Sequence, residues 1–296
     1  MLSVVISTSP GRQADLDCCL QALARQSFTD FEVIVSDDGS EGMQDVLDAH
    51  QDKFRRLEYI WRPNYRSISR TRNRGVSAAL GDDLVLMNTD VLLNPDGLAA
   101  YARTLDQHPL AMLWGYVGCR KRVSAPSQWF PDRRVNWLDF RFFPVSPSRL
   151  WISPLFRQAP YKTASGHHFA LSRATWEKIG AMDESFLDWG EEDVEYALRG
   201  LLKGCSMFLL GDAWAEHLDH PYEEAFHLES PAKLAGKRAR IQEMEAVLMQ
   251  GGLPAGTRVD VLFEDLAGFW AQIQQHYLPS QPDALEDEIN RGGPFL

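Results

Sequence analysis

Short apolar runs alternate with stretches of helical spacing along the first part of the chain, and this alternation restricts the fold more than any other feature. The apolar runs begin at Leu2, Phe31, Leu57, Leu84 and Leu110, and each has the length of a buried strand. Between them, apolar residues recur every three or four positions, as on an amphipathic helix. Because strands and helices alternate, we expect an α/β fold with a mostly parallel sheet that carries helices on both faces.

The alternation stops at about Gly118 and returns after Gln158. A long irregular stretch inside a compact domain is usually functional or disordered. Aromatic residues and arginines are interspersed through this one, and the aromatic content argues against disorder. We interpret residues 118–158 as a partly ordered excursion over the site. Its role, for which we consider binding of an acceptor or of a membrane surface, is left open.

Further elements follow the excursion. We expect ordered strand segments at His167–Leu171 and Met207–Leu210, with helices from Ala174 and from Val194. Beyond Pro221 the pattern indicates helices over about 232–249 and 261–277. The expected organisation is a domain over residues 1–220 and a helical C-terminal extension over residues 221–296. The simplest role of that extension is packing or contact between subunits of an oligomer.

Charge and composition limit the partners. The net charge of −11 argues against general nucleic-acid binding, which needs a positive surface to replace counterions. The four cysteines lack metal-ligand spacing and suit reduced thiols. No apolar stretch approaches the roughly 20 residues that span a bilayer, and no basic segment precedes the first apolar run. We expect a cytoplasmic protein, with peripheral contact at the inner face of the membrane left open.

Two polar residues follow the apolar run that begins at Leu84. Residues two apart on a strand point the same way, so Asn88 and Asp90 are expected on one side of its carboxyl end. Ligands of open α/β sheets bind at that end. A carboxylate there suits a divalent cation shared with substrate phosphates. The alternative is that the two residues only form a turn.

A second pair of acidic residues, Asp37 and Asp38, ends the strand that begins at Phe31. These carboxylates could accept hydrogen bonds from a nucleobase or a ribose, or could simply cap the next helix.

The segment between residues 66 and 74 is unusually rich in arginine. Arg66, Arg70 and Arg74 are four residues apart and would share one face of a helix that reached back that far, and Arg72 lies among them. Guanidinium groups in an acidic protein suggest an anionic partner, because they match phosphate oxygens. A solvated face balanced by nearby acids is the alternative.

A third acidic group, Glu191, Glu192 and Asp193, precedes a helical stripe. The helix dipole favours negative charge at that position and would keep Asp193 ionised, as a general base must be. Plain N-terminal helix charge is the alternative. The preceding Trp189 and Gly190 favour a site, since an aromatic ring beside carboxylates suits stacking on a sugar.

The order of these motifs resembles a known family. The motifs are Thr8, Val33–Ser40, Ser69–Gly75, Asn88–Asp90 and Trp189–Asp193. Together they are similar to family 2 of the inverting glycosyltransferases, which have the GT-A fold, a Rossmann-like sheet flanked by helices. Each motif is weak alone, and the resemblance comes from all five in the right order over residues 2–211.

The resemblance implies roles for the donor and acceptor residues. Thr8 and Asp37 would contact the nucleoside, with Asp37 at a base that is expected to be uracil. Arg72 would approach the base or the diphosphate. Asp193 matches the catalytic base of the family, and Glu192 would orient the acceptor or the sugar. Asp38 and Arg70, which flank these residues in their motifs, are assigned to the donor site with them.

The resemblance also implies a metal site for Mn²⁺ or Mg²⁺. Asn88 and Asp90 match the Asp-x-Asp of the family, with Asp90 as the metal ligand. A late histidine often completes such a site, and His217 is the first candidate and His220 the second. The chain departs from the pattern at Asn88, where the family usually has aspartate. One negative charge is lost there, which puts strict metal dependence in doubt.

The expected function is transfer of a sugar from a nucleotide-sugar, with UDP as the favoured nucleotide, to a hydroxyl of a glycan, lipid-linked or protein acceptor. Inversion would occur by a single displacement at the anomeric carbon. The alternative is an inactive nucleotide-sugar-binding scaffold or partner subunit, which the loss of charge at Asn88 favours. A dehydrogenase is a poor match, because no G-x-G-x-x-G follows the first strand.

Overall fold

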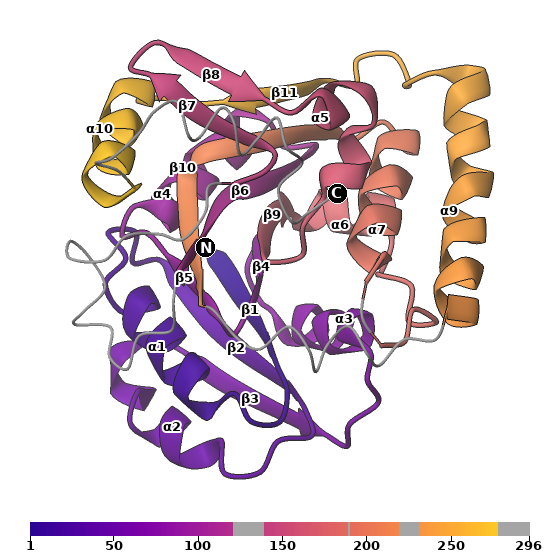
Figure 1. The fold of residues 1–296 in the computed structure, drawn as a ribbon. Coiled ribbons are helices and arrows are strands. Elements are labelled where there is room, and N and C mark those ends of the chain that lie inside the picture. Colours follow the sequence, from indigo (N-terminus) through magenta and orange to yellow (C-terminus); the bar gives the residue numbers. More distant parts are fainter. Residues whose placement is uncertain (121–138, 189, 219–230, 278–296) are drawn as a thin grey trace.

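A computed structural model describes residues 1–120, 139–188, 190–218 and 231–277 (Figure 1). The strands of the main sheet are β1 (Leu2–Thr8), β2 (Phe31–Asp38), β3 (Leu57–Arg62), β4 (Asp83–Asn88), β5 (Val91–Leu93), β6 (Ala111–Arg120), β9 (His168–Ser172), β10 (Ser206–Leu218) and β11 (Val259–Leu262). Their order is β11-β10-β6-β9-β4-β1-β2-β3, and β5 pairs with β10. Most pairs are parallel, whereas β9 runs antiparallel to β4 and β6, and β5 antiparallel to β10. The expected α/β fold with a mostly parallel sheet is confirmed.

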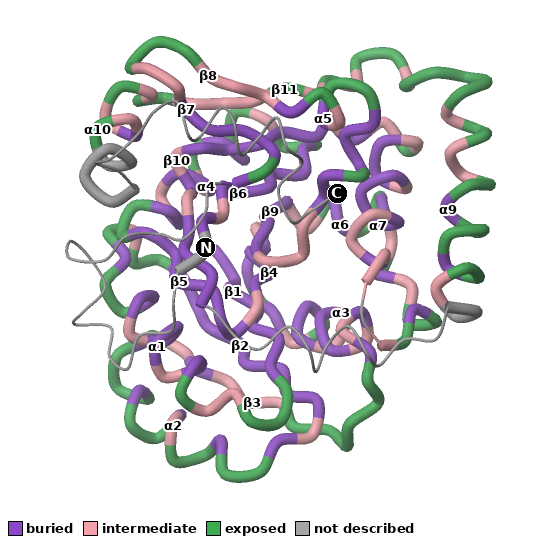
Figure 2. Tube along the Cα trace, in the orientation of Figure 1, coloured by how far each residue is buried: buried purple, intermediate pink, exposed green. Residues whose placement is uncertain are grey.

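Helices cover both faces of this sheet. They are α1 (Gln13–Leu23), α2 (Gln44–Asp48), α3 (Ile68–Ala78), α4 (Gly97–Gln107), α5 (Pro154–Gln158), α6 (Arg173–Ile179), α7 (Glu192–Leu202), α9 (Pro231–Gly251) and α10 (Leu266–Tyr277), with 3₁₀ turns η1 (Gln51–Lys53) and η3 (Pro160–Thr163). One core packs α1, α2 and α4 against the sheet. The other core packs α3, α6, α7, α9 and α10 against the opposite face. Figure 2 shows buried residues along the sheet and many exposed residues on the outer helices.

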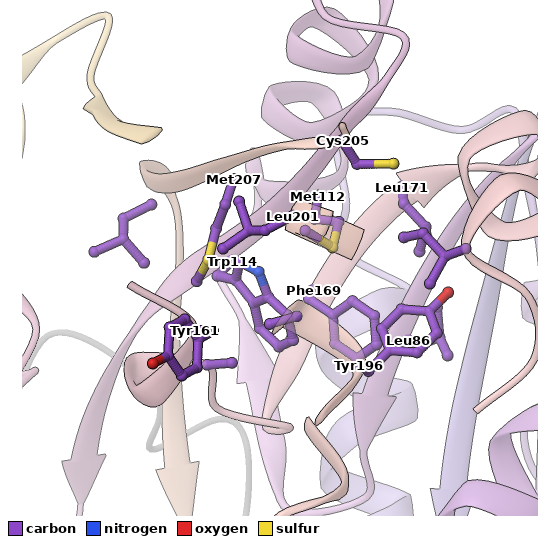
Figure 3. Close-up of a cluster of buried hydrophobic side chains, with 14 of the residues drawn as sticks. Leu86, Met112, Trp114, Tyr161, Phe169, Leu171, Tyr196, Leu201, Cys205 and Met207 are labelled. Atoms are coloured by element: carbon purple, nitrogen blue, oxygen red, sulfur yellow. The ribbon is translucent and has the colours of Figure 1, made fainter. Parts of the chain in front are cut away.

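Aromatic side chains fill the middle of the second core. Trp114 of β6 stacks on Phe169 of β9 with ring centroids 4.4 Å apart. The ring of Tyr196 of α7 is tilted against that of Phe169, with centroids 6.1 Å apart. Figure 3 shows these rings together with Met112 and Met207. Burying such rings removes a large apolar area from water and fixes α7 on the sheet.

Several elements differ from the sequence-based expectation, and two of them are β10 and the last helix. The strand expected at Met207–Leu210 continues to Leu218, because its pairing with β6 resumes at Ala215 after an irregularity between Leu210 and Ala215. The expected start of the last helix, at residue 261, is wrong. Val259–Leu262 form β11, as suits an alternating β-branched segment, and α10 begins at Leu266.

The described part of the excursion is ordered. Phe142–Ser146 (β7) and Arg149–Ile152 (β8) form a hairpin, which α5 follows. Residues 121–138 lie outside the described part. The role of the excursion and the domain boundary at residue 220 stay predictions. No helix in the described ranges has both the length and the apolar character needed to cross a membrane.

Candidate active site

Three parallel strands end side by side and bring sequence-distant residues to one edge of the sheet. Thr8 lies opposite Asp37 in the register of β1 and β2. Ser7 lies opposite Asn88 in the register of β1 and β4. This edge is the carboxyl end of the strands, where open α/β sheets bind ligands.

The β2 carboxylates are held by the protein itself. Asp37 Oδ1 accepts hydrogen bonds from the backbone N and hydroxyl of Ser40, at 3.0 and 2.7 Å, and Oδ2 accepts one from Tyr59 at 2.6 Å. Asp38 accepts from the backbone N of Tyr65 and Arg66, at 3.0 and 2.9 Å. The two residues therefore order the loops beside the site, and their contact with a nucleoside stays a prediction.

Thr8 and the arginines have different surroundings. The buried Thr8 Oγ1 has no hydrogen-bond partner among the described residues. Arg66 precedes α3, so the shared helix face expected for the arginines does not extend to it. Arg66 pairs with Asp188 at 2.7 Å, and Arg70 pairs with Glu184 at 3.0 Å. These two ion pairs agree with the alternative interpretation, in which the arginines form a solvated face balanced by nearby acids.

Arg72 is the exception, because its side chain is fully buried, with 0% exposure. Its Nη2 donates to Asn88 Oδ1 at 3.0 Å and to the carbonyl oxygen of Gly166, and its Nη1 lies 3.9 Å from Glu192 Oε1. The guanidinium also lies over the Phe169 ring at 5.6 Å. Arg72 thus connects the end of β4 to the start of α7.

The start of α7 carries the candidate base. Asp193 Oδ2 accepts from the backbone N of Gly166 at 2.8 Å, and Oδ1 accepts from the backbone N of Val194 at 2.8 Å. Glu192 is 8% exposed, and its Oε2 has no hydrogen-bond partner among the described residues. Both acids are in the first turn of the helix, as expected.

Burial and mutual repulsion make these two acids weaker than usual. Burial, and then the neighbouring Asp193 charge, raise the pKa of Glu192 to about 7, against the opposing effect of Arg72. Burial also raises the pKa of Asp193, which Arg72 and the backbone N–H groups of Gly166 and Val194 oppose. Hydrogen bonds to the charged form favour ionisation. Arg72 and the backbone N–H groups thus favour the ionised form of Asp193 against the effect of burial, whereas a pKa of about 7 leaves Glu192 partly protonated at neutral pH.

The candidate metal residues meet at the pairing of β5 with β10. Asp90 Oδ2 lies 3.5 Å from His217 Nε2 and 3.4 Å from Arg12 Nη1. The His217 ring stands edge-on to that of His167, with centroids 4.6 Å apart. Burial opposes ionisation of Asp90, but His217 and Arg12 hold the pKa of its carboxyl below the ordinary range. Burial lowers the pKa of His167.

Asn88 and Asp90 do not leave an extended strand on one side, as the sequence suggested. β4 ends at Asn88, and Thr89 and Asp90 form a turn before β5. The Asn88 side chain therefore contacts Arg72, while Asp90 contacts His217 and Arg12.

The donor set at Asp90 suits part of a metal site. A carboxylate and an imidazole fit Mn²⁺ or Mg²⁺ if substrate phosphates supply further oxygens. No group of three or more acidic, histidine or cysteine side chains is arranged to hold a metal within the described ranges. The Asn88 oxygen accepts from Arg72. His220, the second histidine candidate, lies outside the described residues.

One short segment joins the two halves of the site. Gly166 N–H binds Asp193, and the adjacent His167 carbonyl oxygen accepts from the backbone N of Asn88 at 2.8 Å. The His167 ring contacts His217. Asp193 and Asp90 therefore lie on either side of residues 166–167, at the same edge of the sheet.

Sequence reasoning missed several residues of this region. They are Arg12, Gly166, His167 and Lys237, whose Nζ donates to the Gly190 carbonyl oxygen at 3.2 Å. The pair His167-His168 at the start of a strand was the available signal for His167. Trp189 lies outside the described residues.

Comparisons with known proteins agree with this architecture. The model of glycosyl transferase family 2 matches residues 3–169, and that of the N-terminal domain of galactosyltransferase matches residues 148–224. Validoxylamine A glucosyltransferase of Streptomyces hygroscopicus subsp. jinggangensis (strain 5008) is 30% identical over 252 residues, which are 74% of this chain and 56% of that protein. The chain thus spans about half the length of the curated relatives it matches.

Solved structures share the fold. S. aureus TarS 1–349 in complex with UDP-GlcNAc has a TM-score of 0.60 at 19% identity, over 92% of this chain and 72% of that chain. GalNAc-T7 with UDP, GalNAc and Mn²⁺ has a TM-score of 0.56 at 14% identity, over 99% of this chain and 58% of that chain. These structures support the GT-A fold, and the family match adds the sequence relationship. The chain belongs to glycosyltransferase family 2.

Proposed function

We propose that this chain transfers a sugar from a UDP-sugar to an acceptor hydroxyl with inversion at the anomeric carbon. The observation that carries the proposal is the position of Arg72, which is buried between Asn88 at the carboxyl edge of the sheet and Glu192 at the start of α7. This contact supports an assignment in which Asp193, the neighbour of Glu192, acts as the base near the end of β4, where a diphosphate would lie. UDP is favoured because TarS, of the same fold, is described with UDP-GlcNAc, and GalNAc-T7 with UDP.

In this mechanism Asp193 accepts the proton of the acceptor hydroxyl as its oxygen attacks the anomeric carbon. The bond from that carbon to the diphosphate oxygen breaks on the opposite side, and UDP leaves. The backbone N–H groups of Gly166 and Val194 orient the Asp193 carboxylate and favour its ionised form, and the raised pKa of Glu192 limits the negative charge beside it. Holding both substrates in line supplies much of the remaining rate.

Positive charge is available for the leaving group. The guanidinium of Arg72 is fixed near the edge where the diphosphate would lie. Thr8 would bind the nucleoside through its buried hydroxyl, beside Asp37. A divalent cation bound by Asp90 and His217 would add Lewis-acid stabilisation of the departing diphosphate.

The proposal is tested with Asp193→Asn. Turnover, measured as UDP released from a panel of UDP-sugars with acceptors, should fall by about 10²–10⁴-fold, the usual contribution of general-base catalysis. UDP affinity, measured by calorimetry, should stay unchanged, because the change removes charge at the acceptor side. Asp106→Asn is the matched control, since Asp106 is exposed on α4 over the other face of the sheet. Full turnover in Asp193→Asn would remove the residue from this role.

A specific observation favours a second function, a nucleotide-sugar-binding scaffold without catalysis. Asn88 lacks the charge of an aspartate and binds Arg72, and Asp90 pairs with Arg12. UDP binding with no UDP release from any donor, in the presence or absence of Mn²⁺, would favour this alternative.

A further inference from the structure

Helix α9 packs beside α7 and lies beyond the residues that match either family model (Figure 1). Its first turns carry three basic residues that contact the segment before α7. We call this segment, residues 183–191 without the undescribed residue 189, the acidic loop. Arg238 Nε lies 2.9 Å from Glu191 Oε1, and Arg240 pairs with Asp183.

Lys237 makes the most buried of these contacts. Its side chain is 8% exposed, its Nζ donates to the Gly190 carbonyl oxygen at 3.2 Å, and it lies over the Phe186 ring at 5.9 Å. A lysine is rarely buried unless its ammonium group is paired. Its partner here is the backbone two residues before Glu192.

The acidic loop has a backbone that needs external support. Asp188 and Glu191 have positive φ angles of 61° and 73°, which are unfavourable for residues other than glycine. Such conformations persist where surrounding structure fixes them, and they concentrate at functional sites. On one side, Asp188 N donates to the Arg66 carbonyl oxygen at 2.6 Å. On the other side, α9 contacts Gly190 and Glu191.

The loop also sets the direction in which the acids point. Glu191 is the N-cap of α7, so a rotation at Gly190 or Glu191 would turn the first turn of the helix, which carries Asp193. α9 is anchored independently at its other end, where Glu245 accepts from Tyr161 at 3.0 Å and pairs with Lys162 at 2.9 Å. A helix fixed in this way can act as a rigid support for the loop.

We propose that Lys237 and Arg238 are positioning residues, which hold the acidic loop so that Asp193 faces the acceptor hydroxyl. This inference rests on the proposed function. It assigns to the C-terminal helix a role in the reaction, in addition to packing. Neither residue touches the substrates in this account; their roles here rest on the contacts with Gly190 and Glu191.

The test compares Lys237→Met, which keeps the apolar stem, with Lys237→Arg, which restores a cation. Lys237→Met should lower kcat by about 10- to 100-fold, the range expected when a distant change misplaces a catalytic group. The donor KM and the UDP Kd should stay within about twofold, because α9 makes no contact with Thr8, Asp37 or Asn88 among the described residues. Lys237→Arg should recover part of kcat. Glu243→Gln, exposed on the same helix, is the control and should match the wild type.

A charge exchange tests Arg238 separately. Arg238→Glu places like charges together and should lower kcat, and adding Glu191→Arg should restore it by reversing the pair. Hydrogen exchange gives a readout without turnover. In Lys237→Met, amides of the acidic loop and of the first turn of α7 should exchange faster, while those of β1 and β4 should not change.

The outcomes distinguish the inference from the proposed function. A wild-type protein that binds UDP but transfers no sugar would contradict the proposed function, and the exchange measurement would still decide whether α9 holds the loop. Unchanged kcat in Lys237→Met, or unchanged exchange in the loop, would refute the positioning role. A parallel loss of kcat, UDP affinity and melting temperature would assign α9 to packing alone.

Discussion

The buried acid at the start of α7 predicts a specific dependence of stability on pH, which Glu192→Gln isolates. Glu192 is 8% exposed and neighbours Asp193, and its pKa is raised from 4.5 to about 7 by burial and then by that neighbour. The folded protein therefore keeps a proton on Glu192 at pH values where the unfolded chain has released it. Other groups that face Glu192 are Arg72 and Lys237, and both favour its ionised form.

The sign and size follow from proton linkage. Between pH 4.5 and 7 the folded state binds about one proton more than the unfolded state, so the free energy of unfolding falls as pH rises. Each pH unit in this window lowers the free energy of unfolding by about 1.4 kcal/mol, and the whole window lowers it by about 3 kcal/mol. The contribution of the protonated Glu192 to stability is fully present below pH 4.5 and is lost as the pH rises through 7. Because Glu192 and Asp193 interact, this figure belongs to the pair.

The assay is urea unfolding at several pH values across this window, for wild type, Glu192→Gln and the exposed control Glu243→Gln. The difference in unfolding free energy between wild type and Glu192→Gln should change by about 3 kcal/mol from pH 4.5 to 8, in favour of the variant at high pH. Titration of groups that do not interact with Glu192 is common to both proteins and cancels, so the remaining difference belongs to the Glu192–Asp193 pair. Parallel curves for wild type and Glu192→Gln would refute the raised pKa and, with it, the assignment of the proton to Glu192.

Further predictions concern the metal residues and the packing beneath them. Arg12→Gln removes a cation 3.4 Å from Asp90 Oδ2 and should tighten Mn²⁺ binding by roughly tenfold, measured by calorimetry without donor; weaker binding would contradict competition at Asp90. Asn88→Asp should also tighten Mn²⁺ binding, because it adds a charge two residues from Asp90, and an unchanged Kd would place residue 88 outside the cation's reach. Gly115→Ala should destabilise the fold by about 1–3 kcal/mol in urea unfolding, since the added Cβ would lie 2.0 Å from His168 Cε1 and 2.4 Å from the Ala213 carbonyl oxygen.

Local patterns were sufficient for the parallel half of the sheet. The apolar runs at Leu2, Phe31 and Leu84 became β1, β2 and β4, because buried strands of this kind carry their signal in their own residues. Parallel pairing then aligns their carboxyl ends without further information, and it brings Thr8, Asp37 and Asn88 to one edge. The roles of these residues toward a donor still depend on the experiments above.

The sequence pattern did not predict how β10 pairs with distant strands. Gly211-Asp212 interrupts the apolar run after Leu210 and suggests the end of a strand, yet β10 resumes beyond a bulge. Only that continuation, with β5 paired antiparallel to it, brings His217 beside Asp90. Register between segments so far apart depends on tertiary packing, which sequence periodicity does not contain.

The arginines of α3 show where a local signal was present but was not used. Arg70 and Arg72 are two residues apart, so they point about 200° apart around the helix. Arg72 shares its face with Ser69 and Val76, three residues before it and four after it, and all three are buried. Gly75 lies beside this face, where an added Cβ would meet Val5 Cγ1 at 2.3 Å, so the helix packs tightly on β1. Small and apolar residues at this spacing predict a buried face, and an arginine on such a face needs partners there. The same spacing leaves Arg70 at the surface with Glu184, which is why only one of the two arginines connects Asn88 to the acids of α7.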